Sequence, residues 1–179
     1  MPDIKTSPAP DQSANQLDSP RAWIVVFAGF VGSFVVFGTS YCFGVFLKPI
    51  ALEFHVSHAS MSALFSMITG LSFFAAPLTG RIADRYGPRP VVAAGALLIG
   101  GGMILAAHVH SFPLLFLTYG IGLGGATACT YIPAISAVGE WFKVHRDIAL
   151  GLAISGIGCG TLVAAPLSAM LIERYGWRT

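Results

Sequence analysis

Residues 91–109 read VVAAGALLIGGGMILAAHV, an unbroken apolar run without a charged side chain. A helix that crosses a bilayer needs about 20 mainly apolar residues, so this run predicts a transmembrane helix. Four more runs of the same character lie on either side of it. The five predicted transmembrane helices are Ala22–Leu47, Ser60–Gly80, Val91–Val109, Phe112–Val138 and Ile148–Ile172.

The composition agrees with a membrane protein. Of the 179 residues, 55% are hydrophobic and only 10% are charged, whereas soluble domains carry about 25% charged residues. The net charge of +2 is too small to indicate a nucleic-acid partner. The three cysteines lie inside apolar runs without CxxC spacing, which favours packing over disulfide or metal binding. We therefore expect an all-α integral membrane protein.

Positive charges predict the orientation, because cytoplasmic loops are enriched in lysine and arginine. Residues 1–20 are rich in proline, serine and aspartate, which predicts a disordered cytoplasmic tail before a transmembrane bundle of residues 21–179. Fewer positive residues fall on the other side of the five helices. The side that holds the N-terminus carries Lys5, Arg21, Arg81, Arg85, Arg89, Lys143 and Arg146, against Lys48, Arg174 and Arg178 opposite. We expect a cytoplasmic N-terminus.

Between the second and third predicted helices lies the charged segment GRIADRYGPRP, residues 80–90. A positively charged cytoplasmic loop would explain its charges alone. Its spacing, with Gly80, Asp84, Arg85, Gly87 and Arg89 in place, resembles the cytoplasmic signature loop of the major facilitator superfamily. The resemblance implies a latch between the two halves of a transporter, in which Asp84 meets a helix end of the second half and the arginines pair nearby.

The segment 141–160 resembles the signature that opens the fifth helix of monocarboxylate-porter-like members of that superfamily. An aromatic–Phe pair, a basic cluster and spaced small residues carry the likeness, at Trp141, Phe142, Arg146, Ala149, Gly151, Gly156 and Gly160. The signature of the first helix is degenerate here, since only Asp18, Ala22 and Trp23 fit it. The resemblance implies a major-facilitator-type helical bundle, of which this chain supplies an incomplete N-terminal half with five helices.

Two similar tetrapeptides suggest an internal repeat. Asp84–Gly87 reads DRYG and Glu173–Gly176 reads ERYG, after the second and fifth predicted helices. These positions fall on opposite membrane faces, as expected for two three-helix units of inverted topology. The second unit lacks its third helix, so we expect a fragment that needs the missing C-terminal helices or another copy of the chain.

Glycines indicate where the predicted helices pack closely. Gly120 and Gly124 lie four residues apart in the fourth helix, and Gly156 and Gly160 do so in the fifth. This spacing puts each pair on one helix face, where a neighbouring backbone can approach. We expect packing to be their role.

Polar side chains within apolar helices are candidates for a solute path, because they tend to face protein or water. Helices one and four contribute to the central cavity in the resembled superfamily, so Tyr41, Thr127 and Tyr131 are the expected substrate contacts. Hydrogen bonding between helices is the alternative for each. Proton-coupled monocarboxylate carriers place a lysine where Tyr41 aligns, and Lys48 lies near the outer surface. Proton coupling and an anionic substrate therefore stay open.

The sequence contains no recognisable catalytic or metal-binding motif. His55, His58, His108 and His110 fall in the two outer loops, with Glu53 as the one carboxylate beside them. Such loops are normally solvated, so we expect no metal site, and no motif indicates a cofactor. No nucleophile with a base is recognisable, which argues against an enzyme.

These observations predict secondary active or facilitated transport of a small organic solute, with a monocarboxylate as one candidate, by alternating access. Five helices form only one wall of a cavity, so the chain alone is expected to be inactive. The alternative is a non-transporting membrane interaction protein derived from a carrier. We expect a multi-pass protein of the plasma membrane whose partners are lipid and the solute.

Overall fold

Six α-helices make up residues 19–176, the part of the chain that the computed structural model describes. No strand occurs among these residues. The helices are α1 (Ala22–Tyr41), α2 (Phe43–Phe54), α3 (His58–Tyr86), α4 (Pro88–His108), α5 (Phe112–Trp141) and α6 (Arg146–Tyr175). Together α1 and α2 form one apolar span, so five spans are long enough to cross a membrane, as predicted. The predicted tail lies outside the described residues except for Ser19 and Pro20.

The five spans are longer than the apolar runs that predicted them. The segment expected to be a loop, residues 80–90, is mostly helical, because α3 continues to Tyr86 and α4 begins at Pro88. Only Gly87 separates these two helices. The prediction of a loop there was wrong because hydropathy marks the part of a helix inside hydrocarbon, whereas charged turns of the same helix can extend into the polar membrane surface.

The first span bends at Cys42, within the run predicted to be one continuous helix. The Thr39 hydroxyl donates to the Val35 carbonyl at 2.8 Å, a bond that often bends helices. The Val45 amide donates to the Cys42 carbonyl at 2.8 Å, in the tighter i to i+3 pattern. Because α2 then runs on to Phe54, this span ends well beyond Leu47.

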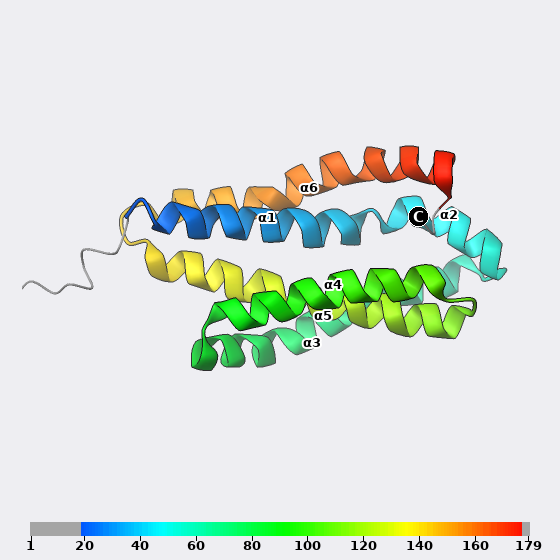
Figure 1. Cartoon of the computed structure of the whole chain (residues 1–179), viewed down its shortest axis with the longest axis horizontal. Coiled ribbons are helices and arrows are strands. Elements are labelled where there is room, and N and C mark those ends of the chain that lie inside the picture. Colours follow the sequence, from blue (N-terminus) through cyan, green and yellow to red (C-terminus); the bar gives the residue numbers. More distant parts are fainter. Residues whose placement is uncertain (1–18, 177–179) are drawn as a thin grey trace, which may run out of the picture.

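The helices form two layers that run along one long axis (Figure 1). One layer holds α1 and α6, which pack extensively on each other, and the other holds α3, α4 and α5. The short connection of Val109–Ser111 joins α4 and α5 into the predicted antiparallel hairpin. The start of α1 and the α3–α4 and α5–α6 connections lie at one end of the molecule (Figure 1).

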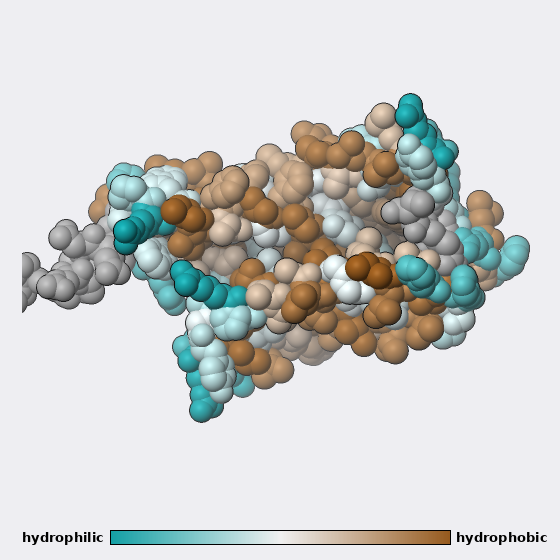
Figure 2. All heavy atoms as spheres, viewed as in Figure 1, coloured by the Kyte–Doolittle hydropathy of each residue, from teal (hydrophilic) through white to brown (hydrophobic). Residues whose placement is uncertain are grey.

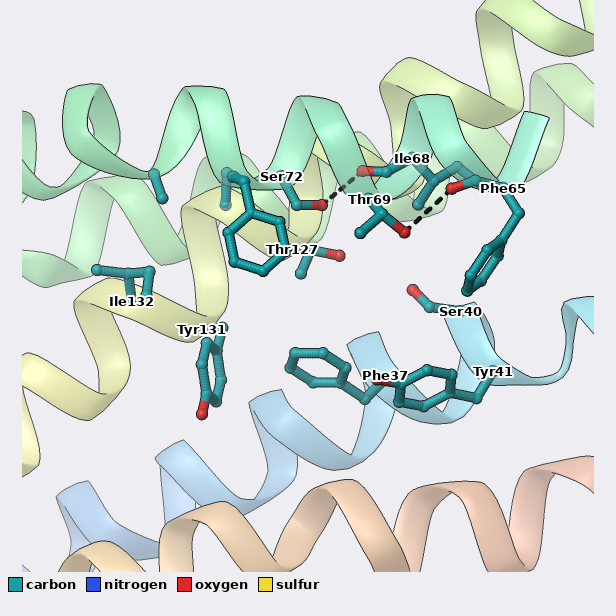
Figure 3. Close-up of a pocket in the computed structure, with 13 residues that line it drawn as sticks. Phe37, Ser40, Tyr41, Phe65, Ile68, Thr69, Ser72, Thr127, Tyr131 and Ile132 are labelled. Atoms are coloured by element: carbon teal, nitrogen blue, oxygen red, sulfur yellow. Dashed lines mark hydrogen bonds between the residues drawn. The ribbon is translucent and has the colours of Figure 1, made fainter. Parts of the chain in front are cut away.

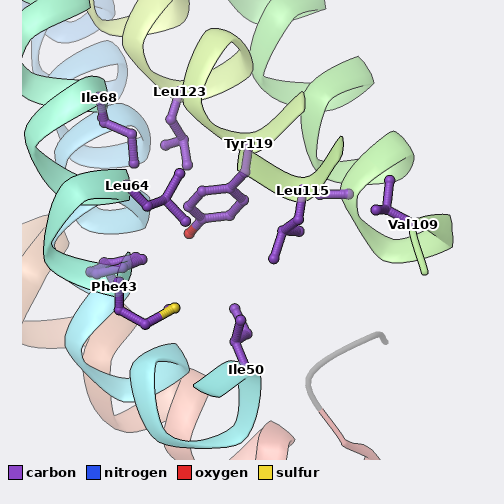
Figure 4. Close-up of a cluster of buried hydrophobic side chains, with 10 residues drawn as sticks. Phe43, Ile50, Leu64, Ile68, Val109, Leu115, Tyr119 and Leu123 are labelled. Atoms are coloured by element: carbon purple, nitrogen blue, oxygen red, sulfur yellow. The ribbon is translucent and has the colours of Figure 1, made fainter. Parts of the chain in front are cut away.

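Two buried clusters stabilise the two ends of the bundle. At one end, Phe43 and Ile50 of α2 pack with residues of α3, α4 and α5 around Leu115 and Tyr119 (Figure 4). At the other end, Val26 and Phe142 bring α1, α5 and α6 together. The outer surface between the polar ends is largely hydrophobic (Figure 2), as expected of a surface that faces lipid.

Glycines allow the closest helix contacts, as predicted. A Cβ atom on Gly156 would meet the carbonyl oxygen of Phe30, and one on Gly160 would lie 2.9 Å from the Cα atom of Phe34. Both glycines of α6 therefore lie directly against the backbone of α1. On α5, a Cβ atom at Gly124 would lie 2.9 Å from the Ile68 carbonyl oxygen of α3.

The two similar tetrapeptides end in the same backbone conformation. Gly87 has φ 87° and ψ 160°, and Gly176 has φ 85° and ψ 170°. Residues with a side chain rarely adopt this region, so glycine fits both positions. Each ends a long helix, and the two lie at opposite ends of the bundle (Figure 1), in agreement with an inverted repeat.

Candidate functional site

A cavity of about 280 Å³ lies between α1, α3 and α5. Its lining residues on α5 are Thr127, Ala128, Tyr131 and Ile132. They lie between Leu123, which belongs to one buried cluster, and Val138, which belongs to the other. The cavity therefore lies near the middle of the membrane spans, where carriers with inverted repeats bind their solutes. The lining residues are Phe37, Ser40, Tyr41, Phe65, Ile68, Thr69, Ser72, Phe73, Ala76, Thr127, Ala128, Tyr131 and Ile132 (Figure 3).

All three residues expected to contact a solute line this one cavity. Tyr41 comes from the end of α1, and Thr127 and Tyr131 come from successive turns of α5. Phe37 connects the two tyrosines: its ring stacks on Tyr41 with centroids 5.8 Å apart and meets Tyr131 edge-on at 5.0 Å. Because the first span extends to Phe54, Tyr41 lies near its middle.

Three hydroxyl groups around the cavity, those of Thr69, Ser72 and Thr127, are already engaged as donors. Thr127 donates to the Leu123 carbonyl at 2.8 Å, and Thr69 donates to the Phe65 carbonyl at 3.0 Å. The Ser72 hydroxyl lies 2.7 Å from the Ile68 carbonyl and 3.1 Å from the Gly124 carbonyl, so it also links α3 to α5. The oxygen atoms of these groups keep lone pairs that can accept hydrogen bonds.

Ser40 differs from Thr69, Ser72 and Thr127 in the hydrogen bonding of its hydroxyl group. It is 7% exposed, and its hydroxyl has no hydrogen-bond partner in the described part of the chain. Figure 3 shows this hydroxyl pointing from α1 toward the α3 wall of the cavity. A buried hydroxyl without a partner costs free energy, which a hydrogen-bond partner would recover.

No charged side chain lines the cavity. Lys48 lies one to two turns further along, on α2, and is exposed. Within residues 19–176, the walls therefore offer aromatic faces and hydroxyl groups but no counter-ion for an anionic solute.

The sequence reasoning missed the contribution of α3. Its lining residues follow helical spacing, at Phe65, Thr69, Ser72 and Ala76, and so share one face. The signal that could have found them is the pair of hydroxyl residues in an otherwise apolar stretch. Thr130, on the same helix as Thr127, packs instead between α1 and α4 against Gly32 and Gly95.

The residues of the signature at the α3–α4 junction remain apart from this cavity. Asp84 and Arg85 lie in the last turn of α3, and Arg89 lies in the first turn of α4. All three are exposed, and the Arg85 guanidinium lies 5.4 Å from the centroid of the Tyr86 ring. Within residues 19–176, Asp84 makes no hydrogen bond or ion pair. A Cβ atom on Gly80 would meet nothing within 4 Å.

The fifth-helix signature instead builds the contact between α1 and α6. Phe142 is 2% exposed and its ring meets Trp23 edge-on at 5.3 Å. Ala149, Gly156 and Gly160 occupy one buried face of α6 against α1. The other signature residues, Trp141, Arg146 and Gly151, are exposed, and the Arg146 guanidinium lies beside Gly139.

Among the described residues, no group of three or more His, Cys, Asp or Glu side chains could hold a metal ion. The hydroxyl groups of Ser155 and Thr161 on α6 donate to carbonyl groups of their own helix. The cavity of α1, α3 and α5 is therefore the place where the predicted solute-contacting residues meet.

Five membrane-length spans packed in two layers define this part of the chain as a helical integral membrane bundle. The model of the Major Facilitator Superfamily matches residues 29–179, and the chain belongs to this family. It is 34% identical over 161 residues to monocarboxylate transporter 13 of Rattus norvegicus, covering 90% of this chain and 38% of that protein. It is 32% identical to monocarboxylate transporter 3 of Gallus gallus, covering 90% of this chain and 30% of that protein.

The family match confirms the predicted superfamily, and the relatives confirm the predicted resemblance of this chain to monocarboxylate transporters. The chain spans about 38% of the length of the rat relative that it matches.

Proposed function

We propose that this chain forms part of a carrier that moves a small organic solute across a membrane by alternating access. The observation that carries the proposal is the cavity near mid-span, where Tyr41, Thr127 and Tyr131 come together. Transport by members of this family and the names of the relatives support a solute path there and make monocarboxylates the first class to test.

The cavity has walls from only three helices of this chain, so further helices must supply the opposite wall. We propose that the chain alone does not transport and that the α3–α4 junction contacts those helices. The excess of positive charge supports a cytoplasmic location of that junction and of the N-terminus. The expected membrane is the plasma membrane.

Uptake measurements test this proposal. This chain, followed by the remaining helices of the carrier, would be reconstituted in liposomes and supplied with labelled short-chain carboxylates and other small organic solutes. We expect saturable uptake, lowered about tenfold or more by Tyr131→Ala, because a cavity-lining ring is lost.

Leu97→Ala is the matched control, since Leu97 lies on α4, does not line the cavity and is 78% exposed. It should leave uptake unchanged. Correctly inserted protein that shows no saturable uptake of any solute would contradict the proposal and favour the non-transporting interaction protein.

A further inference from the structure

We propose that the cavity between α1, α3 and α5 binds an aromatic ring, so that the substrate class is arylalkyl solutes. This inference rests on the proposed function and specifies its site. Five of the lining residues are aromatic, and they come from all three walls: Phe37, Tyr41, Phe65, Phe73 and Tyr131.

The volume suits a single ring with a short chain. A dry apolar cavity of about 150 Å³ is enough to bind benzene, and this cavity measures about 280 Å³. Because the cavity is open on the side away from α1, α3 and α5, the chain attached to the ring can extend out of it.

The aromatic walls still have free surface for a ligand. Phe37 contacts Tyr131 of α5 and Tyr41 of α1 at centroid distances of 5.0 and 5.8 Å, within the range that aromatic pairs prefer. Phe73 of α3 is 74% exposed, and Tyr41 is 50% exposed. A ring between these walls would extend an existing set of ring contacts.

The polar groups determine which end of the solute enters. The hydroxyl groups of Tyr41 and Tyr131 can donate to a ring substituent or to a polar atom of the chain. Since no lining residue is charged, an ionised carboxylate would lose its hydration here without compensation. The ring therefore enters this cavity, and any charged group of the solute points away from it.

Binding to the 179-residue chain in detergent micelles tests this directly. The probes are 3-phenylpropionate and 3-cyclohexylpropionate, which share the carboxylate and chain length but differ in the π face. We expect the phenyl compound to bind about tenfold more tightly, as two aromatic contacts would give. Equal affinities, or no binding of the phenyl compound, would overturn the inference.

Two variants of α1 provide the matched comparison. Phe37→Leu keeps an apolar side chain and removes the π face, so the preference for the phenyl compound should fall to about twofold or less. Retained binding of the cyclohexyl compound shows that the variant still folds. Phe27→Leu, at a position that is 67% exposed on the same helix, should keep the full preference. An unchanged preference in Phe37→Leu would contradict the assignment of the ring site.

Uptake by the longer carrier separates this inference from the proposed function. Uptake of short aliphatic carboxylates without preference for aryl compounds would refute the ring site and leave transport intact. Ring binding by the chain without uptake of any solute would refute transport and leave the ring site intact.

Discussion

At the scale of single residues, the fold depends on positions where the backbones of two helices are in direct contact, with no side chain between them. Gly156 and Gly160 lie against the backbone of Phe30 and Phe34. A backbone segment cannot move aside as a flexible side chain can, so an added methyl group must push the two helices apart.

We predict that Gly160→Ala lowers the free energy of unfolding by about 1–3 kcal/mol, as overpacking does in other cores. Thermal unfolding in detergent micelles would measure the change. Gly158→Ala is the control, because a Cβ atom there meets nothing within 4 Å. Equal melting temperatures for the two variants would contradict the proposed contact between α1 and α6.

A second prediction concerns Tyr119, whose ring is buried between Leu64, Leu115 and Leu123 (Figure 4). Its hydroxyl has no hydrogen-bond partner in the described part of the chain. Removing an unsatisfied polar atom costs nothing in lost bonds, so Tyr119→Phe should leave the melting temperature unchanged or raise it.

Tyr119→Ala should lower the stability by about 3 kcal/mol, because it leaves a cavity in the cluster. Unfolding of both variants by urea or by heat, compared with the unchanged chain, would measure the difference in stability. A clear loss of stability in Tyr119→Phe would show that the hydroxyl has a partner in the membrane.

The sequence predicted the role of individual residues only where chemistry and spacing were both unusual. Tyr41, Thr127 and Tyr131 could be predicted because polar groups are rare in apolar helices. Phe37 and Phe73 could not, because an aromatic residue in a transmembrane helix is as compatible with lipid as with a cavity. Only the packing of three helices separates these two possibilities.

At the scale of elements, hydropathy located all five spans but not their ends. The charged last turns of α3 are helical, and the bend at Cys42 has no mark in the apolar pattern. Helix ends depend on caps and backbone conformation, as at Gly87, rather than on mean hydropathy. The repeat of DRYG and ERYG was informative because both tetrapeptides end a helix in the same conformation.

The C-terminal turn of α3 leads to a prediction about the latch. Asp84 is exposed and has no partner within residues 19–176, which supports the proposal that it contacts helices outside this chain. Asp84→Asn in the longer carrier should therefore reduce uptake several-fold and leave membrane insertion unchanged, since the loss of one charge weakens a charge-assisted hydrogen bond.

Uptake at equal surface abundance would measure this effect. The control is Asp147→Asn, which removes an exposed carboxylate from the first turn of α6 instead. Unchanged uptake in Asp84→Asn would remove the latch role.

At the scale of the whole molecule, the protein is a helical bundle with a largely hydrophobic outer surface and an uncharged cavity between α1, α3 and α5. Two buried clusters hold the ends of the helices together, and the cavity lies between them. This arrangement separates the parts that stabilise the bundle from the part that would contact a solute. The packing of α1 on α6 lies outside the cavity, so the two functions can be changed independently.

The most direct test of the central claim asks whether the cavity admits water and solute. Single cysteines would replace Tyr131 or Leu97 in a variant whose native cysteines, Cys42, Cys129 and Cys159, are changed to alanine. The longer carrier, with any further cysteines also replaced, would then be treated in a lipid bilayer with a water-soluble maleimide, which reacts with thiolates that water can reach. We predict that Tyr131→Cys is modified and that Leu97→Cys, on the exposed apolar surface of α4, is not. If Tyr131→Cys is as unreactive as Leu97→Cys, the cavity is not a solute path.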